Sequence, residues 1–220
     1  MKILSIETSG KVCAVALTED ETLIEEEIIE DENTHSVKLM PLVDELLKKT
    51  NTNIKDIDLF ACDIGPGSFT GIRIGVATIK AFLDVTNKKA VGVTSLEILA
   101  ENVQEDGIIC SVIDAKNQNA YFGIFEKNGK DLKQIEEFKF DNINNIVNYV
   151  KNINKKIIFV GDGSIAYKDM IQCELENVEV LEEGKLNARN IGKAAFRKKE
   201  KAVETNDLKP IYLRKSNAER

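Results

Sequence analysis

A glycine-rich run at residues 63–73, Asp-Ile-Gly-Pro-Gly-Ser-Phe-Thr-Gly-Ile-Arg, limits the possible folds of this chain more than any other segment. It lies between an apolar run at 57–64 and a helical pattern at 72–83, so the chain must turn sharply from a strand into a helix. Ser68 or Thr70 is a suitable N-cap for that helix. The free N–H groups at a helix N-terminus can bind an anion, although a tight turn whose glycines only permit close packing is the commoner interpretation.

Two widespread phosphate-binding motifs do not match this run. A P-loop requires lysine and then serine or threonine after its last glycine, whereas Gly71 is followed by Ile72 and Arg73. A dinucleotide-binding loop requires Gly-x-Gly-x-x-Gly, and here the third glycine comes one residue late. Gly71 and Gly75 lie four residues apart on one face of the predicted helix, where small residues would let another helix approach.

Hydrophobic periodicity predicts the same order of elements twice along the chain. In the first half we predict strands at 2–7, 12–18, 23–29, 57–64 and 90–93, and helices at about 34–49, 72–83 and 95–103. In the second half we predict strands at 108–114, 120–126, 132–140, 156–160 and 178–181, and helices at 143–150, 165–171 and 188–198. Asn33 and Thr34 would cap the first helix. The duplication predicts an α/β protein with two tandem units.

The composition is typical of a globular protein with a substantial core, with 43% hydrophobic and 30% charged residues among 220. The net charge of −7 argues against a chain that binds nucleic acid by itself, because such chains present a basic surface to the phosphates. We find no signal-peptide pattern and no apolar span long enough to cross a membrane. We therefore expect a cytoplasmic chain without membrane contact.

Cysteine and histidine usage indicates no metal centre. The four cysteines are widely spaced without a Cys-x-x-Cys pair, so we expect reduced, buried thiols at Cys13, Cys62, Cys110 and Cys173. The chain has one histidine, His35, so a second imidazole ligand is lacking. We predict no metal site and no catalytic residues.

Three segments resemble the TsaB (YeaZ) family, whose members are partner subunits in bacterial tRNA threonylcarbamoyladenosine synthesis. The run Gly-Pro-Gly-Ser-Phe-Thr-Gly-Ile-Arg-Ile-Gly at 65–75 looks like the family signature. His-Ser-Val-Lys-Leu-Met-Pro at 35–41 resembles its His-Ser-x-x-Leu-x-Pro, and Pro-Ile-Tyr-Leu-Arg at 210–214 resembles its Pro-x-Tyr-Leu-Arg ending. These are the residues on which the resemblance rests.

The family is a branch of the actin-like ATPase superfamily. The resemblance therefore implies two tandem actin-like (ribonuclease H-like) subdomains, each a mixed sheet with flanking helices. We place the first subdomain at 1–104 and the smaller second one at 105–204, and we expect the tail at 205–220 to return to the first.

The resemblance also implies a function. The chain would be a noncatalytic scaffold or activator that binds TsaD and, through it, the ATPase TsaE, alongside a TsaC-type threonylcarbamoyl-AMP synthase. The complex would transfer threonylcarbamoyl from threonylcarbamoyl-AMP to the adenosine next to the tRNA anticodon. Binding of tRNA, and of ATP or ADP with Mg²⁺, would belong to the complex and not to this chain, which would form a homodimer when alone.

The two helices at about 34–49 and 72–83 are implied by the resemblance to form the contact with TsaD and with a second copy. Their apolar spacing is equally consistent with helices that cover their own sheet. The candidate interface residues are His35, Leu39, Met40, Val43, Leu47, Gly71, Ile72, Gly75, Thr78, Ile79 and Phe82.

In the actin-like superfamily the first hairpin of each subdomain contacts the phosphates of a nucleotide. The resemblance places Glu7, Thr8 and Ser9 in the first such hairpin and Asp114 in the second. Glu7 stands where the family usually has aspartate, which keeps the charge on a longer side chain. We interpret these residues as part of a vestigial nucleotide-binding site.

The second hairpin, which follows Asp114, departs further from the family's sequence pattern. Lys116 and Asn119 stand in place of the family's arginine and glutamate. Lysine does not replace arginine at a bidentate contact. A third segment, Gly161, Asp162 and Gly163, follows a predicted strand and opens a helix, and its backbone could approach an adenosine or a phosphate. An ordinary turn is the commoner interpretation of so short a motif.

Two other functions stay open. A small ATPase or kinase of the same superfamily would bind Mg-ATP through Glu7, Thr8, Asp114 and the 161–163 turn, but these motifs contain no clear general base. A glycoprotease-like peptidase would need a nucleophile with a paired base, and no residue spacing in the sequence indicates one.

Overall fold

The computed structural model describes residues 1–30 and 35–214. Contacts divide the chain into two units. Unit 1 comprises Met1–Ile98 and Leu186–Ile211, and the described part of unit 2 comprises Leu99–Lys185 and residues 212–214. The predicted capping residues Asn33 and Thr34 lie outside the described residues.

Unit 1 is built on a five-stranded mixed sheet in the order β3-β2-β1-β4-β5. Its strands are β1 (Lys2–Glu7), β2 (Val12–Glu19), β3 (Thr22–Glu30), β4 (Leu59–Asp63) and β5 (Lys89–Val93). The first three form an antiparallel meander, and β4 and β5 continue in parallel with β1. The inner strands are buried along nearly their whole length because helices cover both faces.

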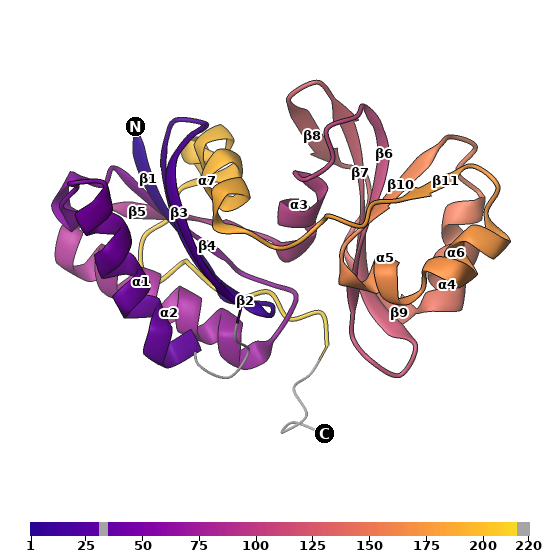
Figure 1. The fold of residues 1–220 in the computed structure, drawn as a ribbon, viewed down its shortest axis with the longest axis horizontal. Helices are drawn as coiled ribbons and strands as arrows, with labels where there is room; N and C mark the ends of the chain where they lie inside the picture. The colour runs from indigo at the N-terminus through magenta and orange to yellow at the C-terminus, as the bar shows by residue number, and fades with distance from the viewer. Residues whose placement is uncertain (31–34, 215–220) are drawn as a thin grey trace. The chain divides into compact units, whose positions relative to one another are not determined.

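Helices α1 (His35–Lys49) and α2 (Phe69–Thr86) cover one face of this sheet and α7 (Ala188–Arg197) covers the other (Figure 1). Short 3₁₀ turns, η1 (Ile54–Asp56) and η2 (Lys199–Lys201), follow α1 and α7. The predicted N-cap of α2 is confirmed, because the Ser68 side chain accepts a hydrogen bond from the Gly71 amide (3.2 Å).

Unit 2 repeats the same sheet. Its strands are β6 (Gly107–Asp114), β7 (Asn119–Asn128), β8 (Asp131–Gln134), β9 (Lys139–Asn142), β10 (Ile157–Val160) and β11 (Val178–Val180). The order β8-β7-β6-β10-β11 matches the order β3-β2-β1-β4-β5 of unit 1 strand for strand. The additional strand β9 pairs with β7. Helices α4 (Ile143–Lys151), α5 (Asp162–Ala166) and α6 (Lys168–Glu174) belong to this unit, while α3 (Ser95–Ala100) spans the boundary. The predicted duplication is therefore confirmed.

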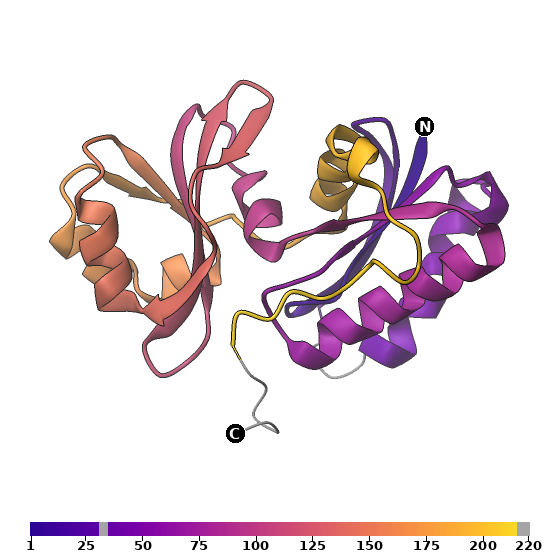
Figure 2. The same ribbon diagram turned by 180° about the vertical axis from the view of Figure 1, so that it is seen from behind.

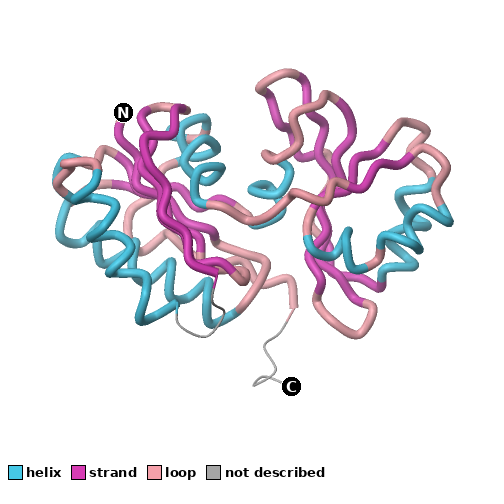
Figure 3. The backbone as a smooth tube through the Cα atoms, in the orientation of Figure 1, coloured by secondary structure: helices cyan, strands magenta, loops and turns pink. Residues whose placement is uncertain are grey.

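Several predicted details are wrong. The single strand at 132–140 is two strands, β8 and β9, separated by a loop (Figure 3), and the helix at 165–171 is two short helices. Cys173 is exposed, whereas Cys13, Cys62 and Cys110 are buried as expected.

Helix α7 belongs to unit 1, although we expected it in the second subdomain. Its buried residues Ile191, Ala194 and Ala195 pack against Ile3 and Ala61 of the first sheet. The amphipathic pattern of a helix predicts that one side is buried, but it does not specify which sheet covers that side.

The C-terminal segment runs back along unit 1 (Figure 2). Val203 pairs with Ala90, Leu208 is buried, and the Ile211 amide donates to Ile64 O (2.7 Å). Residues 212–214 belong to unit 2, so the return of the tail to the first unit ends at Ile211.

Candidate functional site

Two neighbouring parallel strands of unit 1 both end on an acidic residue. β1 ends at Glu7 and β4 at Asp63, and Ile6 is paired with Cys62 in the register. Glu7 is fully buried, and Asp63 is 2% exposed. We did not predict Asp63 as a site residue, although an acid at the end of each of two adjacent parallel strands is a signal that the sequence contains.

Ser9 bridges these two carboxyl groups. Its hydroxyl oxygen lies 2.8 Å from Glu7 Oε1 and 2.6 Å from Asp63 Oδ2. The Ser9 amide donates to Glu7 Oε1 (2.6 Å). Asp63 Oδ1 accepts from the Gly65 amide (2.6 Å) and from the Ser95 hydroxyl (2.8 Å), whereas Glu7 Oε2 is buried without a hydrogen-bond partner. The result is a closed polar cluster at the end of the sheet.

The glycine-rich run packs directly against the β1–β2 hairpin. The Ser68 amide donates to Ser9 O (2.8 Å), and the Thr8 hydroxyl donates to Gly71 O (2.8 Å). A Cβ atom on Gly71 would lie 1.9 Å from Thr8 O, and one on Gly67 would lie 2.6 Å from Ser9 O. The glycines therefore allow close packing, which is the second of the two interpretations given above.

Two amides at the start of α2 are already engaged within the protein. The Ser68 and Gly71 amides at the start of α2 already donate to Ser9 O and Ser68 Oγ. The Asp63 carboxylate and the Thr8 carbonyl oxygen nearby would repel an anion. The structure thus brings Glu7, Thr8 and Ser9 together, but in a cluster that the protein fills with its own groups.

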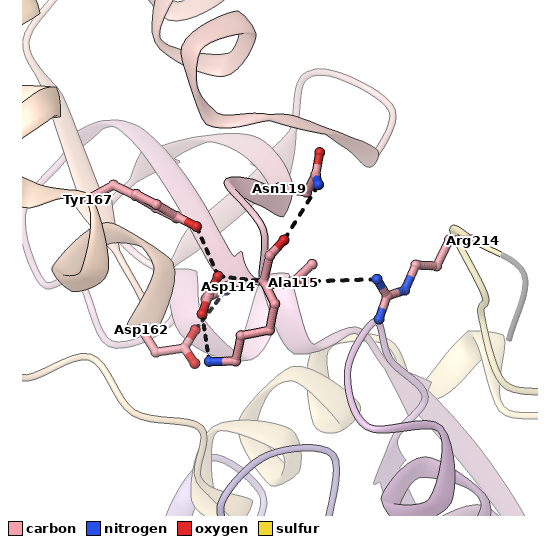
Figure 4. A network of polar contacts seen from close by, with 7 residues as sticks. Asp114, Ala115, Asn119, Asp162, Tyr167 and Arg214 are labelled. Carbon is pink, nitrogen blue, oxygen red and sulfur yellow. Dashed lines mark hydrogen bonds and ion pairs between the residues drawn. The ribbon is translucent and has the colours of Figure 1, made fainter. Parts of the chain in front are cut away.

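In unit 2 the corresponding hairpin, between β6 and β7, is centred on Asp114 (Figure 4). The Asp114 carboxylate accepts hydrogen bonds from the Lys116 amide (2.9 Å), from Lys116 Nζ (2.8 Å) and from the Tyr167 hydroxyl (3.1 Å). Partial burial acts to raise the pKa of Asp114, but the hydrogen bonds and charge of Lys116, with Tyr167, outweigh it and hold the pKa below its usual value. Asp114 is therefore an ionised structural carboxylate.

The turn at 161–163 lies against this hairpin, as Figure 4 shows for Asp162. Asp162 Oδ1 accepts from the Asp114 amide (3.1 Å). A Cβ atom on Gly163 would lie 3.0 Å from Asp114 N, and one on Gly161, whose φ is +109°, would lie 2.3 Å from Val112 O. The structure thus brings the predicted residues Asp114 and 161–163 together. Gly161 and Gly163 allow the turn to pack closely against the end of β6.

The tip of the β6–β7 hairpin has an uncommon backbone. Lys116, Asn117 and Gln118 have φ angles of 67°, 54° and 59°, in the left-handed region that non-glycine residues seldom adopt. The Asn119 amide donates to Lys116 O (3.1 Å), and its side chain donates to Asn117 O (3.0 Å). Lys116 and Asn119, where this chain departs from the resembled pattern, therefore both form bonds within the hairpin itself.

Arg214 joins this cluster and was not predicted. Its guanidinium donates to Ala115 O (3.4 Å; Figure 4). It also lies 5.7 Å and 5.6 Å from the ring centres of Tyr121 and Phe140. These contacts hold the last described residues of the tail on unit 2.

Most of the predicted interface residues face the core of unit 1. The buried ones are His35, Leu39, Val43, Gly71, Ile72, Gly75 and Ile79. Leu47, Thr78 and Phe82 are partly exposed, and Met40 is 51% exposed. Gly71 and Gly75 bring α2 close to Thr8 of its own hairpin, so they do not leave room for a second helix.

The outward sides of α1 and α2 carry a different set of apolar residues. Val37 and Val85 are each 69% exposed, and Met40, Ala77 and Ala81 are also exposed. We call these five residues the α1–α2 outer face. Ala77, Ala81 and Val85 recur every four residues, a signal that we missed because the inward side of α2 is more strongly apolar.

His35 is turned toward the first hairpin. Its side chain is buried, and Nε2 lies 3.1 Å from Gly10 O. Among residues 1–30 and 35–214, no group of three or more His, Cys, Asp or Glu side chains could hold a metal ion. In the same described ranges, no helix has the length and apolar composition needed to span a membrane.

The sequence and fold have known relatives. A family model described as "TsaD: tRNA N6-adenosine threonylcarbamoyltransferase" matches residues 22–220. The tRNA threonylcarbamoyladenosine biosynthesis protein TsaB of Bacillus subtilis (strain 168) is 31% identical over 221 residues, which cover 100% of this chain and 96% of the relative. This chain belongs to the TsaB family. The solved structure of YeaZ from Pseudomonas aeruginosa superposes with a TM-score of 0.81 at 20% identity, covering 96% of this chain and 99% of the other.

More distant structures place this TsaB-family chain in the actin-like fold. A putative N-acetylmannosamine kinase from Listeria monocytogenes gives a TM-score of 0.53 at 11% identity, over 91% of this chain and 100% of the kinase. At such low identity the likeness concerns the fold alone. The predicted fold of two tandem actin-like units is thereby confirmed.

Proposed function

We propose that this chain is a noncatalytic partner subunit in tRNA threonylcarbamoyladenosine synthesis. It would bind a TsaD-type transferase and, through it, TsaE. A TsaC-type synthase would be a further partner. It would thereby support the transfer of threonylcarbamoyl from threonylcarbamoyl-AMP to the adenosine beside the tRNA anticodon, in the cytoplasm. The observation that carries the proposal is the full-length similarity, at 31% identity, to a protein named for this biosynthesis.

The α1–α2 outer face is our candidate for the contact with the transferase. Val37, Met40 and Val85 expose most of their apolar side chains on two helices that share one core. Apolar residues grouped on adjacent helices are typical of surfaces that bind other proteins. The same face would pair two copies of the chain when the transferase is absent. The net charge of −7 fits a subunit that leaves tRNA binding to its partners.

Reconstitution tests this proposal. We expect the transferase, TsaE, threonylcarbamoyl-AMP and tRNA to yield modified adenosine when this chain is present. Without it, the rate should fall by about tenfold or more, a loss of about 1.4 kcal/mol or more of transition-state stabilisation. Full activity without this chain, or modification by this chain alone, would contradict the proposal.

A small ATPase or kinase is the alternative, because the distant neighbours include a protein named as a putative kinase. The contacts of Ser9 with Glu7 and Asp63 speak against it, since they engage the hydroxyl that a phosphate at this hairpin would use. We expect calorimetric titration of the isolated chain with Mg-ATP to give no binding tighter than about 1 mM. Micromolar binding with turnover by the pure chain would instead support the enzyme.

A further inference from the structure

In the Glu7–Ser9–Asp63 cluster, each short contact between two oxygen atoms needs a proton to be a hydrogen bond. The hydroxyl groups supply one proton too few. The Ser9 hydroxyl has a single proton, yet its oxygen lies 2.8 Å from Glu7 Oε1 and 2.6 Å from Asp63 Oδ2. If both carboxyl groups were ionised, one of these contacts would join two oxygen atoms with no proton between them. The Ser95 hydroxyl does not supply the missing proton, because it donates to Asp63 Oδ1 (2.8 Å).

We propose that Glu7 is a neutral carboxylic acid in the folded protein, and that its proton completes a buried chain in which Glu7 donates to Ser9 and Ser9 donates to Asp63. The proton belongs to Glu7 because Asp63 also accepts from Gly65 and Ser95, and these donors stabilise an ionised carboxylate. Glu7 has a single backbone donor, the Ser9 amide.

The surroundings of Glu7 favour this assignment. Burial raises the pKa of Glu7 well above its usual value, and the negative charge of Asp63 and a hydrogen bond with Asp63 add to the effect, while the hydrogen bonds from Ser9 oppose it. Burial also raises the pKa of Asp63, but there the hydrogen bonds with Glu7, Ser9, Gly65 and Ser95 all oppose the rise.

Besides Asp63, the titratable side chains near Glu7 on β2 and β4 are the thiols of Cys13 and Cys62. Burial raises the pKa of both thiols, so neither is ionised near neutral pH. On α1, His35 contacts Gly10 O.

The proton chain holds the start of α2 in place. Asp63 accepts from the Gly65 amide, and Ser9 O accepts from the Ser68 amide, so both ends of the 65–68 turn are bound to members of the chain. Loss of the Glu7 proton would leave two negative charges in contact inside the protein and weaken both attachments. This inference is independent of the proposed function, because it concerns α2 whatever its partner.

Glu7→Gln tests the inference, since glutamine is neutral and of similar shape. Between the pKa of Glu7 in the unfolded chain and its raised pKa in the folded protein, only the folded state holds the proton. The folded-to-unfolded ratio of the wild type should then fall by about tenfold per pH unit relative to the variant. We expect the variant to be the more stable protein at neutral pH, with an advantage that grows from acid to neutral pH. Urea unfolding at several pH values measures this.

Two further measurements make the result decisive. In wild-type protein labelled at the glutamate carboxyl carbons, one NMR signal should keep the protonated shift at neutral pH, and Glu7→Gln should remove it. Glu97→Gln is the matched control, because Glu97 is buried but forms an ion pair with Lys198, so its variant should be less stable than the wild type at neutral pH. No protonated signal at neutral pH would overturn the inference, and so would a Glu7→Gln variant that is equally destabilised at every pH. If the variant does not fold, the NMR titration of the wild type decides.

Discussion

Replacing both Val37 and Met40 by glutamate is expected to abolish binding of the TsaD-type transferase while the chain stays folded. The two residues lie three positions apart on α1 and are 69% and 51% exposed, so they project from the same side of the helix. Glutamate is a good helix former, and exposed positions tolerate it. At the centre of an apolar contact, two buried charges should weaken binding by at least about 100-fold, or about 3 kcal/mol.

Ile165→Glu is the matched control for this prediction. Ile165 lies on α5 of unit 2 and is 47% exposed, so the same chemical change occurs at a similar exposure away from the α1–α2 outer face. Dissociation constants measured by surface plasmon resonance, together with circular dichroism, compare the variants. Wild-type affinity of the double variant would exclude this face, and an equal loss in the control would indicate a general effect on the fold.

A second large effect is expected from Gly71→Ala. The added Cβ atom would lie 1.9 Å from the carbonyl oxygen of Thr8 and 3.0 Å from its carbonyl carbon. These are backbone atoms, so no side-chain rotation relieves the overlap, and α2 must move away from the first hairpin. We expect the free energy of unfolding to fall by at least about 3 kcal/mol, a large part of the stability of a typical domain.

Ala81→Leu separates this packing effect from the general cost of a larger residue in α2. Ala81 is exposed on the same helix, and leucine is a good helix former. Urea unfolding should therefore give a change within about 0.5 kcal/mol of the wild type. A Gly71→Ala variant as stable as Ala81→Leu would show that the hairpin and α2 are not in contact in solution.

The polar clusters illustrate how far sequence reasoning reaches. Glu7, Thr8 and Ser9 were found because they are contiguous and match a known pattern. Asp63 and Ser95, their partners, lie 54 and 86 residues from Ser9 in the chain. Their proximity depends on the pairing of β4 beside β1, and so do the hydrogen bonds that give the cluster its chemistry. Arg214 reaches Ala115 over a still longer separation.

Sequence alone determined the type and order of the elements, the sharp turn before α2 and the family, because each of these follows from residues that are close together in the chain. The tertiary structure alone decided which sides of α1 and α2 face outward, since both sides carry apolar residues and periodicity only groups them. It also decided that α7 covers the first sheet and that Asp63 stands beside Glu7. These outcomes depend on packing between distant segments, whose partners no local pattern specifies.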